Sequence, residues 1–215
     1  MRRTSPVLLI VLGIVVILLF WGCSGYNGLV QQDETVKKVW NNVQSQYQRR
    51  SDLIPNLVNT VQGEANFERG TLTDVISARA RATQVQVNAN DLTPDKLQQF
   101  QQAQAQLSGA LGRLLAVAEN YPNLQTNQAF QNLMAELSGT ENRIAVARND
   151  FNSAVQDYNV RVRRFPTNIL AGIMGFHPRE GFTADPGSQN APKVNFPNNP
   201  STAPTVPTTL DTSRK

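Results

Sequence analysis

The chain has 215 residues, of which 40% are hydrophobic, with a formal net charge of +4. Its mean hydropathy of −0.34 excludes a multi-span membrane protein. One cysteine and one histidine exclude a disulfide framework, a zinc finger and a site with several histidine ligands. A Ser-His or Cys-His nucleophile would depend on His177, which lies in a Gly- and Pro-rich stretch. We therefore predict no catalytic residues and no metal or other cofactor.

The positive charge is spread over the chain and does not indicate nucleic acid as a partner. Residues 26–182 hold 15 Lys and Arg against 14 Asp and Glu, so most of the excess lies at the two ends. The one basic cluster is Arg161, Arg163 and Arg164. Basic residues at this place are typical of a helix C-terminus, where they complement the helix dipole.

The N-terminal segment, residues 1–26, is predicted to be a membrane anchor. Val7 to Trp21 is an apolar run interrupted only by Gly13, and the 29 residues from Thr4 to Gln32 carry no charge. With its uncharged flanks the segment is long enough to cross a bilayer as a helix. Two alternatives remain open at this stage: lipidation of Cys23 after signal cleavage, although Trp21 is bulky for a lipobox, and ordinary cleavage near Ser24.

Arg2 and Arg3 precede the apolar run and set the expected orientation. The positive-inside rule favours a cytoplasmic N-terminus and an extracytoplasmic folded domain. We therefore predict a single-pass protein of a bacterial membrane, with the membrane itself as one partner.

Residues 27–182 are predicted to form an antiparallel four-helix bundle, so the fold class is all-α. Apolar residues recur every three or four positions, which is the helical period. The helices are expected at residues 29–61, 71–88, 93–118 and 126–164, with a kink or short break between Ser51 and Pro55. Thr93 is expected to cap the third helix, ahead of Pro94 at its first position. Short connections between the helices favour antiparallel neighbours.

The last of these helices carries a seven-residue repeat that predicts a packed seam. The seam is expected to contain Phe130, Leu137, Ile144, Phe151, Tyr158 and Phe165. A second stripe four residues further on includes Glu141 and Arg148, which we expect to meet charges from another helix. A di-metal site in the bundle core would need Glu-x-x-His motifs, and the single histidine lies outside the predicted helices.

The segment after Phe165 loses the helical period. Residues 167–182 are expected to dock on the end of the bundle, with a position near the lipid surface as the alternative. Residues 183–215 contain six prolines and many Thr, Asn and Ser, which predicts a disordered tail or spacer.

Eight blocks of the sequence resemble the LemA family in content and in order. They are residues 26–30 (YNGLV), 39–43 (VWNNV), 49–58 (RRSDLIPNLV), 75–80 (VISARA), 111–122 (LGRLLAVAENYP), 136–145 (ELSGTENRIA), 157–159 (DYN) and 164–166 (RFP). The resemblance implies a bacterial, membrane-anchored antiparallel helical bundle without a settled biochemical activity, sometimes linked to membrane-stress or proteolysis systems. It implies nothing for the Pro/Thr-rich tail.

The predicted function is a protein-interaction or scaffold module held at the membrane, with an unknown protein partner. No phosphate-binding loop, nucleophile elbow or dinucleotide signature is present, and no small-molecule substrate is evident. The alternatives are an enzyme with an unrecognised site, a protein of the lipid surface or of membrane stress, and a lipoprotein anchored through Cys23.

Overall fold

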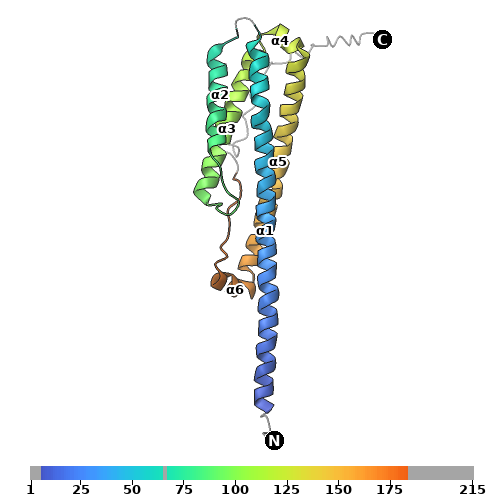
Figure 1. The fold of residues 1–215 in the computed structure, drawn as a ribbon, viewed down its shortest axis with the longest axis vertical. Coiled ribbons are helices and arrows are strands. Elements are labelled where there is room, and N and C mark those ends of the chain that lie inside the picture. Colours follow the sequence, from blue (N-terminus) through green and yellow to red (C-terminus); the bar gives the residue numbers. More distant parts are fainter. Residues whose placement is uncertain (1–5, 65–66, 184–215) are drawn as a thin grey trace, which may run out of the picture. The chain divides into compact units, whose positions relative to one another are not determined.

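The computed structural model describes residues 6–64 and 67–183, and this part of the chain contains six helices and no strand (Figure 1). The all-α prediction is confirmed. Residues up to Phe182 make one compact unit. The disordered tail is predicted for residues 183–215, of which 184–215 lie outside the described residues. Arg2 and Arg3, on which the predicted orientation rests, lie outside them as well.

Helix α1, Pro6–Gln62, is a single helix of 57 residues. Its N-terminal part is long and apolar enough to cross a membrane by length and composition, and none of that part is buried against the rest of the described chain. Figure 1 shows it extending beyond the level of α6 with no other described helix beside it. The predicted helix start near Leu29 is therefore wrong, because the apolar segment and the first bundle helix are continuous.

Of the kink or short break predicted between Ser51 and Pro55, the break is absent, because α1 passes through Pro55 without interruption. Proline has no N–H to donate to the carbonyl four residues earlier, which is that of Ser51. Nε of Arg79 donates to this carbonyl oxygen instead, at 2.9 Å. Pro55 itself is exposed, so its ring faces away from the core.

Three further long helices follow: α2, Arg69–Gln84; α3, Pro94–Ala118; and α5, Gln128–Arg163. With α1 they lie side by side and alternate in direction along the chain (Figure 1). The Thr93 side chain caps α3 by accepting from the backbone N–H of Lys96, and Pro94 follows it, as predicted.

Two further helix ends differ from the predicted positions, and at each of them a side chain forms hydrogen bonds with the backbone. Helix α2 ends at Gln84 and not at Asn88, because the Val87 carbonyl accepts hydrogen bonds from α1, from Trp40 Nε1 at 2.9 Å and Gln44 Nε2 at 2.8 Å. The last long helix begins at Gln128, because the Asn127 side chain caps it. The preceding residues form the separate short helix α4, Pro122–Thr126.

The seam of α5 is buried at five of its six predicted positions, from Phe130 to Tyr158. The sixth prediction is wrong: Phe165 is 75% exposed. Helix α5 ends at Arg163, so the seven-residue spacing no longer places residue 165 on the inner face.

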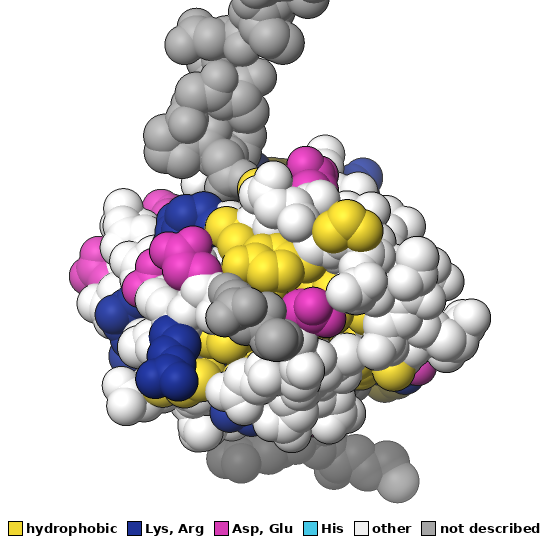
Figure 2. Space-filling view, turned by 90° about the horizontal axis from the view of Figure 1, so that it is seen from above, with side chains coloured by type: hydrophobic (Ala, Val, Ile, Leu, Met, Phe, Trp, Pro, Cys, Tyr) yellow, Lys and Arg dark blue, Asp and Glu magenta, His cyan; other side chains and the backbone are white. Residues whose placement is uncertain are grey.

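The buried side chains form two hydrophobic clusters along the bundle. The cluster nearer the apolar part of α1 is centred on Trp40. The centre of its ring lies 5.4 Å from the ring centre of Phe100, 5.3 Å from that of Phe151 and 5.9 Å from that of Phe182. The second cluster includes Leu57, Leu107 and Leu114 and reaches the far end of the bundle. At that end, Figure 2 shows hydrophobic side chains in the middle of the face, with acidic side chains next to them.

The segment after α5 docks on the bundle, as predicted. It begins with the short helix α6, Thr167–Met174, and continues in extended form to Phe182. Ala171 and Phe182 are buried in the Trp40 cluster, and the Asn152 side chain pairs with the backbone of Phe182 through both its oxygen and its amide nitrogen. This segment therefore completes the core at the end nearest the apolar part of α1.

Candidate functional site

A layer of polar side chains separates the two hydrophobic clusters. Its members are Arg50 of α1, Gln104 of α3 and Glu141 of α5. In each helix the polar residue lies between a residue of one cluster and a residue of the other: Tyr47 and Ile54, Phe100 and Leu107, and Ile144 and Leu137.

Arg50 is the centre of this layer and is 1% exposed. Its Nη1 donates to Glu141 Oε1 at 2.6 Å and to Ser108 Oγ at 2.9 Å. Its Nη2 donates to the side-chain oxygen of Gln104, and the guanidinium carbon lies 5.0 Å from the centre of the Tyr47 ring. The layer therefore links three helices through one cation.

The two charged side chains of the layer differ in their exposure to solvent. The Glu141 side chain is 47% exposed and keeps contact with solvent, whereas its Arg50 partner does not. Nε of Arg50 is buried and has no hydrogen-bond partner among the described residues. A buried charge is costly unless it is paired, so Arg50 depends on Glu141 more than Glu141 depends on Arg50. This arrangement suits helix alignment rather than proton transfer.

Glu141 and Arg148 of the second stripe of α5 both make contacts outside their own helix. Glu141 meets a charge from another helix, as expected, and that charge is Arg50. Arg148 lies with its guanidinium carbon 4.8 Å from the centre of the Phe182 ring, in a cation–π contact with the docked segment.

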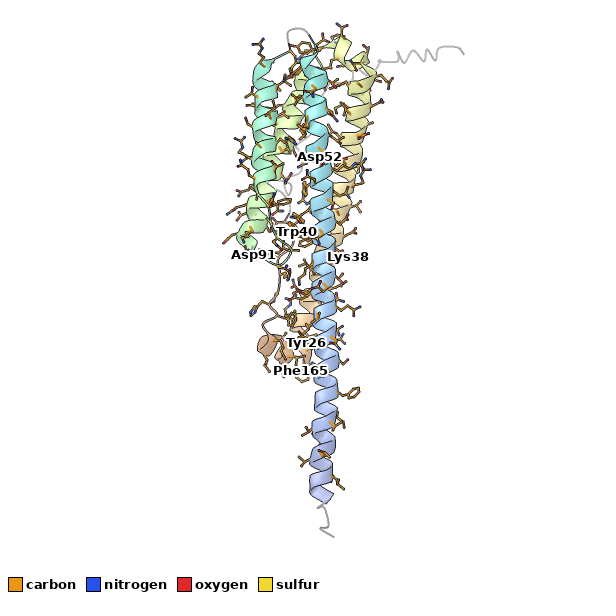
Figure 3. The ribbon with its side chains drawn as sticks, in the orientation of Figure 1. Tyr26, Lys38, Trp40, Asp52, Asp91 and Phe165 are labelled. Carbon is orange, nitrogen blue, oxygen red and sulfur yellow. The ribbon has the colours of Figure 1, made fainter. Side chains whose placement is uncertain are left out.

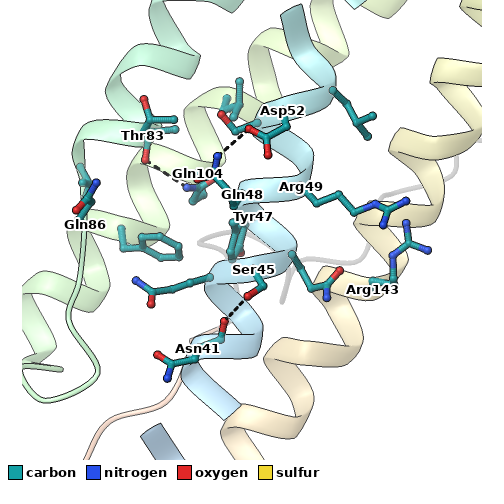
Figure 4. A pocket seen from close by; sticks show the side chains of 18 of the residues that line it. Asn41, Ser45, Tyr47, Gln48, Arg49, Asp52, Thr83, Gln86, Gln104 and Arg143 are labelled. Atoms are coloured by element: carbon teal, nitrogen blue, oxygen red, sulfur yellow. Dashed lines mark hydrogen bonds between the residues drawn. The ribbon is translucent and has the colours of Figure 1, made fainter. Parts of the chain in front are cut away.

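A groove of about 1140 Å³ runs along α1 next to the polar layer (Figure 4). Half of its lining residues are uncharged and polar, among them Asn41, Gln44, Ser45 and Gln48 on α1, Thr83 and Gln86 near the end of α2, and Gln104 on α3. Arg49 and Arg143 lie toward α5 (Figure 4), and Asp52 and Glu136 complete the charged part of the lining. Side-chain amides offer both donors and acceptors, so the groove can pair with main-chain groups of a bound segment.

Cys23, the alternative lipidation site, and His177, on which a nucleophile would depend, do not line this groove. Cys23 is exposed on the apolar part of α1, where its lipidation stays an untested prediction. His177 is exposed in the docked segment, and its carbonyl oxygen accepts from the Tyr158 hydroxyl at 3.0 Å. In residues 6–64 and 67–183, no three His, Cys, Asp or Glu side chains lie together as metal ligands would.

A second polar cluster ties the docked segment to α1. Arg179 Nη2 lies 2.7 Å from Asp33 Oδ1, and Asp33 Oδ2 lies 2.9 Å from Lys37 Nζ. Hydrogen bonds to Glu34 and Asp33 raise the pKa of Lys37 above its ordinary value of 10.5. Burial, assisted by the negative charge of Asp33, raises the pKa of the Tyr158 hydroxyl above 10.0. Both groups therefore stay protonated near neutral pH and act as donors.

Comparison with known proteins relates the chain to several bacterial proteins. It is 29% identical over 180 residues to "Magnetosome protein MamQ 2" of Paramagnetospirillum magneticum, a match that covers 75% of this chain and 65% of that protein. It is 22% identical over 145 residues to "Protein LemA" of Metamycoplasma hominis, covering 67% of this chain and 63% of the relative. The matches thus span just under two thirds of the length of these relatives.

The sequence pattern of the LemA family matches residues 39–196, which is well over half of the chain. The matched region includes the polar layer, the groove and the docked segment. The all-helical structure, with α1 apolar at its N-terminal part, agrees with the helical bundle that the resemblance to this family implies. The chain is a membrane-associated protein and belongs to the LemA family.

Proposed function

We propose that this protein is a membrane-held interaction module that binds a segment of a partner protein in the groove along α1. The observation that carries the proposal is the groove itself: about 1140 Å³, open to solvent, with Asn, Gln, Ser and Thr making up half of its lining residues. Such a lining offers many hydrogen bonds of modest strength and suits an extended polypeptide.

Hydrogen bonds within the protein hold two of the groove side chains in place, which also favours the binding of a partner segment. Gln104 belongs both to the groove and to the polar layer, where it accepts from Arg50. The Gln44 side chain is held by the Val87 carbonyl. Binding surfaces whose side chains are already ordered lose less conformational entropy when a partner binds. The groove walls are therefore prepared for a partner.

The proposal includes an absence of catalysis. Within the described residues the groove contains no histidine or cysteine, and its two acidic residues, Asp52 and Glu136, come from different helices. Asp52 accepts from Gln48 at 2.7 Å and so is engaged on its own helix. A hydrolase screen of the purified full-length protein should give no turnover above the background; reproducible turnover lost on substitution of a groove residue would contradict this part of the proposal.

Site-specific crosslinking in native membranes tests the interaction. A photo-reactive amino acid is placed at Gln48 or Gln86, both exposed in the groove, and at Gln156, an exposed glutamine of α5 outside it. The two groove positions should give the same adduct, and position 156 should not. The adduct should weaken when Ser45 or Thr83 is replaced by a bulky residue such as Trp. Equal adducts at all three positions, or none from the groove, would refute the proposal.

The predicted orientation, with a cytoplasmic N-terminus and an extracytoplasmic bundle, is retained as part of this proposal. It decides on which side of the membrane the partner lies. Protease added to intact cells or spheroplasts should reach the bundle in this orientation.

A further inference from the structure

Helix α6 has two different faces. One face packs on α1 and the core: Ala171 is buried, and a Cβ atom added at Gly25 would lie 3.2 Å from Leu170 Cδ2. The ring centres of Tyr26 and Phe176 are 6.1 Å apart, which fixes the residues after α6 on the same part of α1. The other face is apolar and uncovered by the rest of the described chain. Ile169, Ile173, Met174 and the nearby Phe165 are each more than half exposed.

This uncovered face lies at the end of the apolar segment of α1. Figure 3 shows Tyr26 and Phe165 at the same level along α1. A bilayer hydrocarbon core is about 30 Å thick, which corresponds to about 20 helical residues. Twenty residues counted back from Gly25 reach Pro6, at the start of the uncharged stretch. When α1 crosses a bilayer, α6 is therefore placed at the membrane surface.

The charges around α6 match the same location. Arg161, Arg163 and Arg164 are exposed in and after the last turn of α5, and residues 158–178 contain no Asp or Glu. The Arg161 guanidinium lies against α1, because a Cβ added at Gly28 would fall 1.7 Å from its Nη2. Arginine beside exposed apolar side chains is the composition of helices that lie in the interface of an anionic membrane.

We propose that α6 and Phe165 form an interfacial contact with the bilayer that α1 crosses, with apolar side chains among the acyl chains and the three arginines at lipid phosphates. The partner is an anionic lipid surface. This contact is supported by its continuity with the exposed apolar surface of α1 and by charge complementarity. It does not depend on the groove or on any protein that binds there.

The contact would fix the bundle against the membrane at a second point. A single helix leaves a domain free to tilt, whereas two neighbouring contacts restrict tilt and depth. The short distance between Leu170 and Gly25 makes these two contacts one rigid unit. The groove would then be held at a constant height above the bilayer.

Depth-dependent fluorescence quenching in vesicles tests the proposal with the full-length chain. An environment-sensitive fluorescent amino acid is placed at Ile173, and doxyl groups in the lipid headgroup region or at mid-chain serve as quenchers. Val146 is the matched control, because it is an exposed aliphatic residue of α5 about 26 Å from the end of that helix. Val16, exposed on the apolar part of α1, reports whether the anchor is inserted.

The expected pattern is a blue-shifted emission at 173 with the strongest quenching by shallow doxyl groups, deep quenching at 16 and neither effect at 146. Quenching at 173 should increase when phosphatidylglycerol is added to phosphatidylcholine vesicles. Substituting Arg163→Gln and Arg164→Gln together should remove that increase while emission from position 16 stays unchanged.

Two results would overturn the proposal while leaving the anchor in place. If position 16 is quenched and position 173 is as insensitive as 146, the face does not meet lipid. If emission at 173 is blue-shifted but unaffected by doxyl lipids, the face is covered by protein, either a second copy or another chain.

Discussion

Arg79 of α2 donates its Nε hydrogen to the Ser51 carbonyl, the group that Pro55 leaves without its usual helical donor. A residue on a neighbouring helix thus takes over a backbone hydrogen bond inside α1. The contact satisfies a carbonyl in a largely buried part of the helix and also joins α2 to α1. It accounts for a proline in the middle of a helix that does not break there.

This relationship predicts coupling between two substitutions. Arg79→Met should lower the free energy of unfolding by about 1–2 kcal/mol, because the carbonyl loses its partner. In a Pro55→Ala background the new N–H can bond to Ser51, so the same substitution should cost about 1 kcal/mol less. Urea unfolding of the full-length protein in detergent, followed by Trp40 fluorescence in a Trp21→Phe background, measures the difference. Arg81→Met, at an exposed position of the same helix, is the control and should have little effect in either background.

The polar layer predicts unequal effects of its two charges. Glu141→Gln keeps the size of the side chain but leaves Arg50 buried without a counter-charge, so it should lower the free energy of unfolding by about 2–4 kcal/mol. Adding Arg50→Met should recover part of that loss, because the uncompensated charge is gone. The same unfolding measurement applies, with Glu136→Gln on α5 as control. If Glu141→Gln and Glu136→Gln have equally small effects, the ion pair does not stabilise the layer.

Trp40 is predicted to hold the chain between α2 and α3 in place. Trp40→Phe removes the hydrogen bond to the Val87 carbonyl and leaves a void among three phenylalanine rings, which should cost about 2–4 kcal/mol. Amide hydrogen exchange should become faster in residues 85–93 before it does so in α3. Trp21→Phe, in the apolar segment, should leave exchange in this loop unchanged; equal exchange in both variants would contradict the role given to Trp40.

The pKa of Tyr158 predicts a loss of stability in alkali. Burial raises this pKa, so the folded protein holds the hydroxyl proton at a pH where the unfolded chain has released it. The resulting stabilisation is complete below pH 10.0 and is lost as the pH rises through the higher folded-state value. Lys37, whose pKa is raised mainly by its hydrogen bond to Glu34, acts in the same direction.

Tyr158→Phe should therefore flatten the decline of stability between neutral and strongly alkaline pH. It should also cost about 1 kcal/mol at neutral pH, because the hydrogen bond to the His177 carbonyl is lost. Thermal unfolding followed by circular dichroism over that pH range gives both values, with Tyr26→Phe at a partly exposed tyrosine as the matched control. An unchanged pH profile in Tyr158→Phe would reject the assignment.

The sequence predicts the long helices and most of their buried faces, because the period of apolar residues reports directly on burial. It predicts helix ends less well, since these depend on contacts between distant residues. Helix α2 ends at Gln84, before the predicted Asn88, where Trp40 and Gln44 reach the Val87 carbonyl from α1. Phe165 fits the seven-residue repeat of α5 but lies beyond the end of the helix.

Only Glu141 of the polar layer is predicted from the sequence to meet a charge, although Arg50 and Gln104 also lie within apolar stripes. Along α1, buried residues follow steps of three and four through Val43, Tyr47, Ile54 and Leu57, and Arg50 occupies the position between Tyr47 and Ile54. Gln104 interrupts the stripe of α3 in the same way. A polar residue within the apolar stripe of each of three helices indicates a shared layer, but only the structure shows that the three lie at one level. The groove has no such signal, because its glutamines resemble those of any solvated helix face.

The unbroken course of α1 has a mechanical consequence. Each helical residue adds 1.5 Å of length and about 100° of rotation, so one residue inserted at position 27 would turn the bilayer-spanning end by more than a quarter of a circle beneath the core. A continuous helix without a hinge transmits rotation between the apolar segment and the bundle in both directions. A change in lipid thickness or a shear force on its apolar end would therefore be transmitted to Trp40, about 21 Å along the helix axis from Tyr26. Strain within the bundle would be transmitted to the surrounding lipid in the same way.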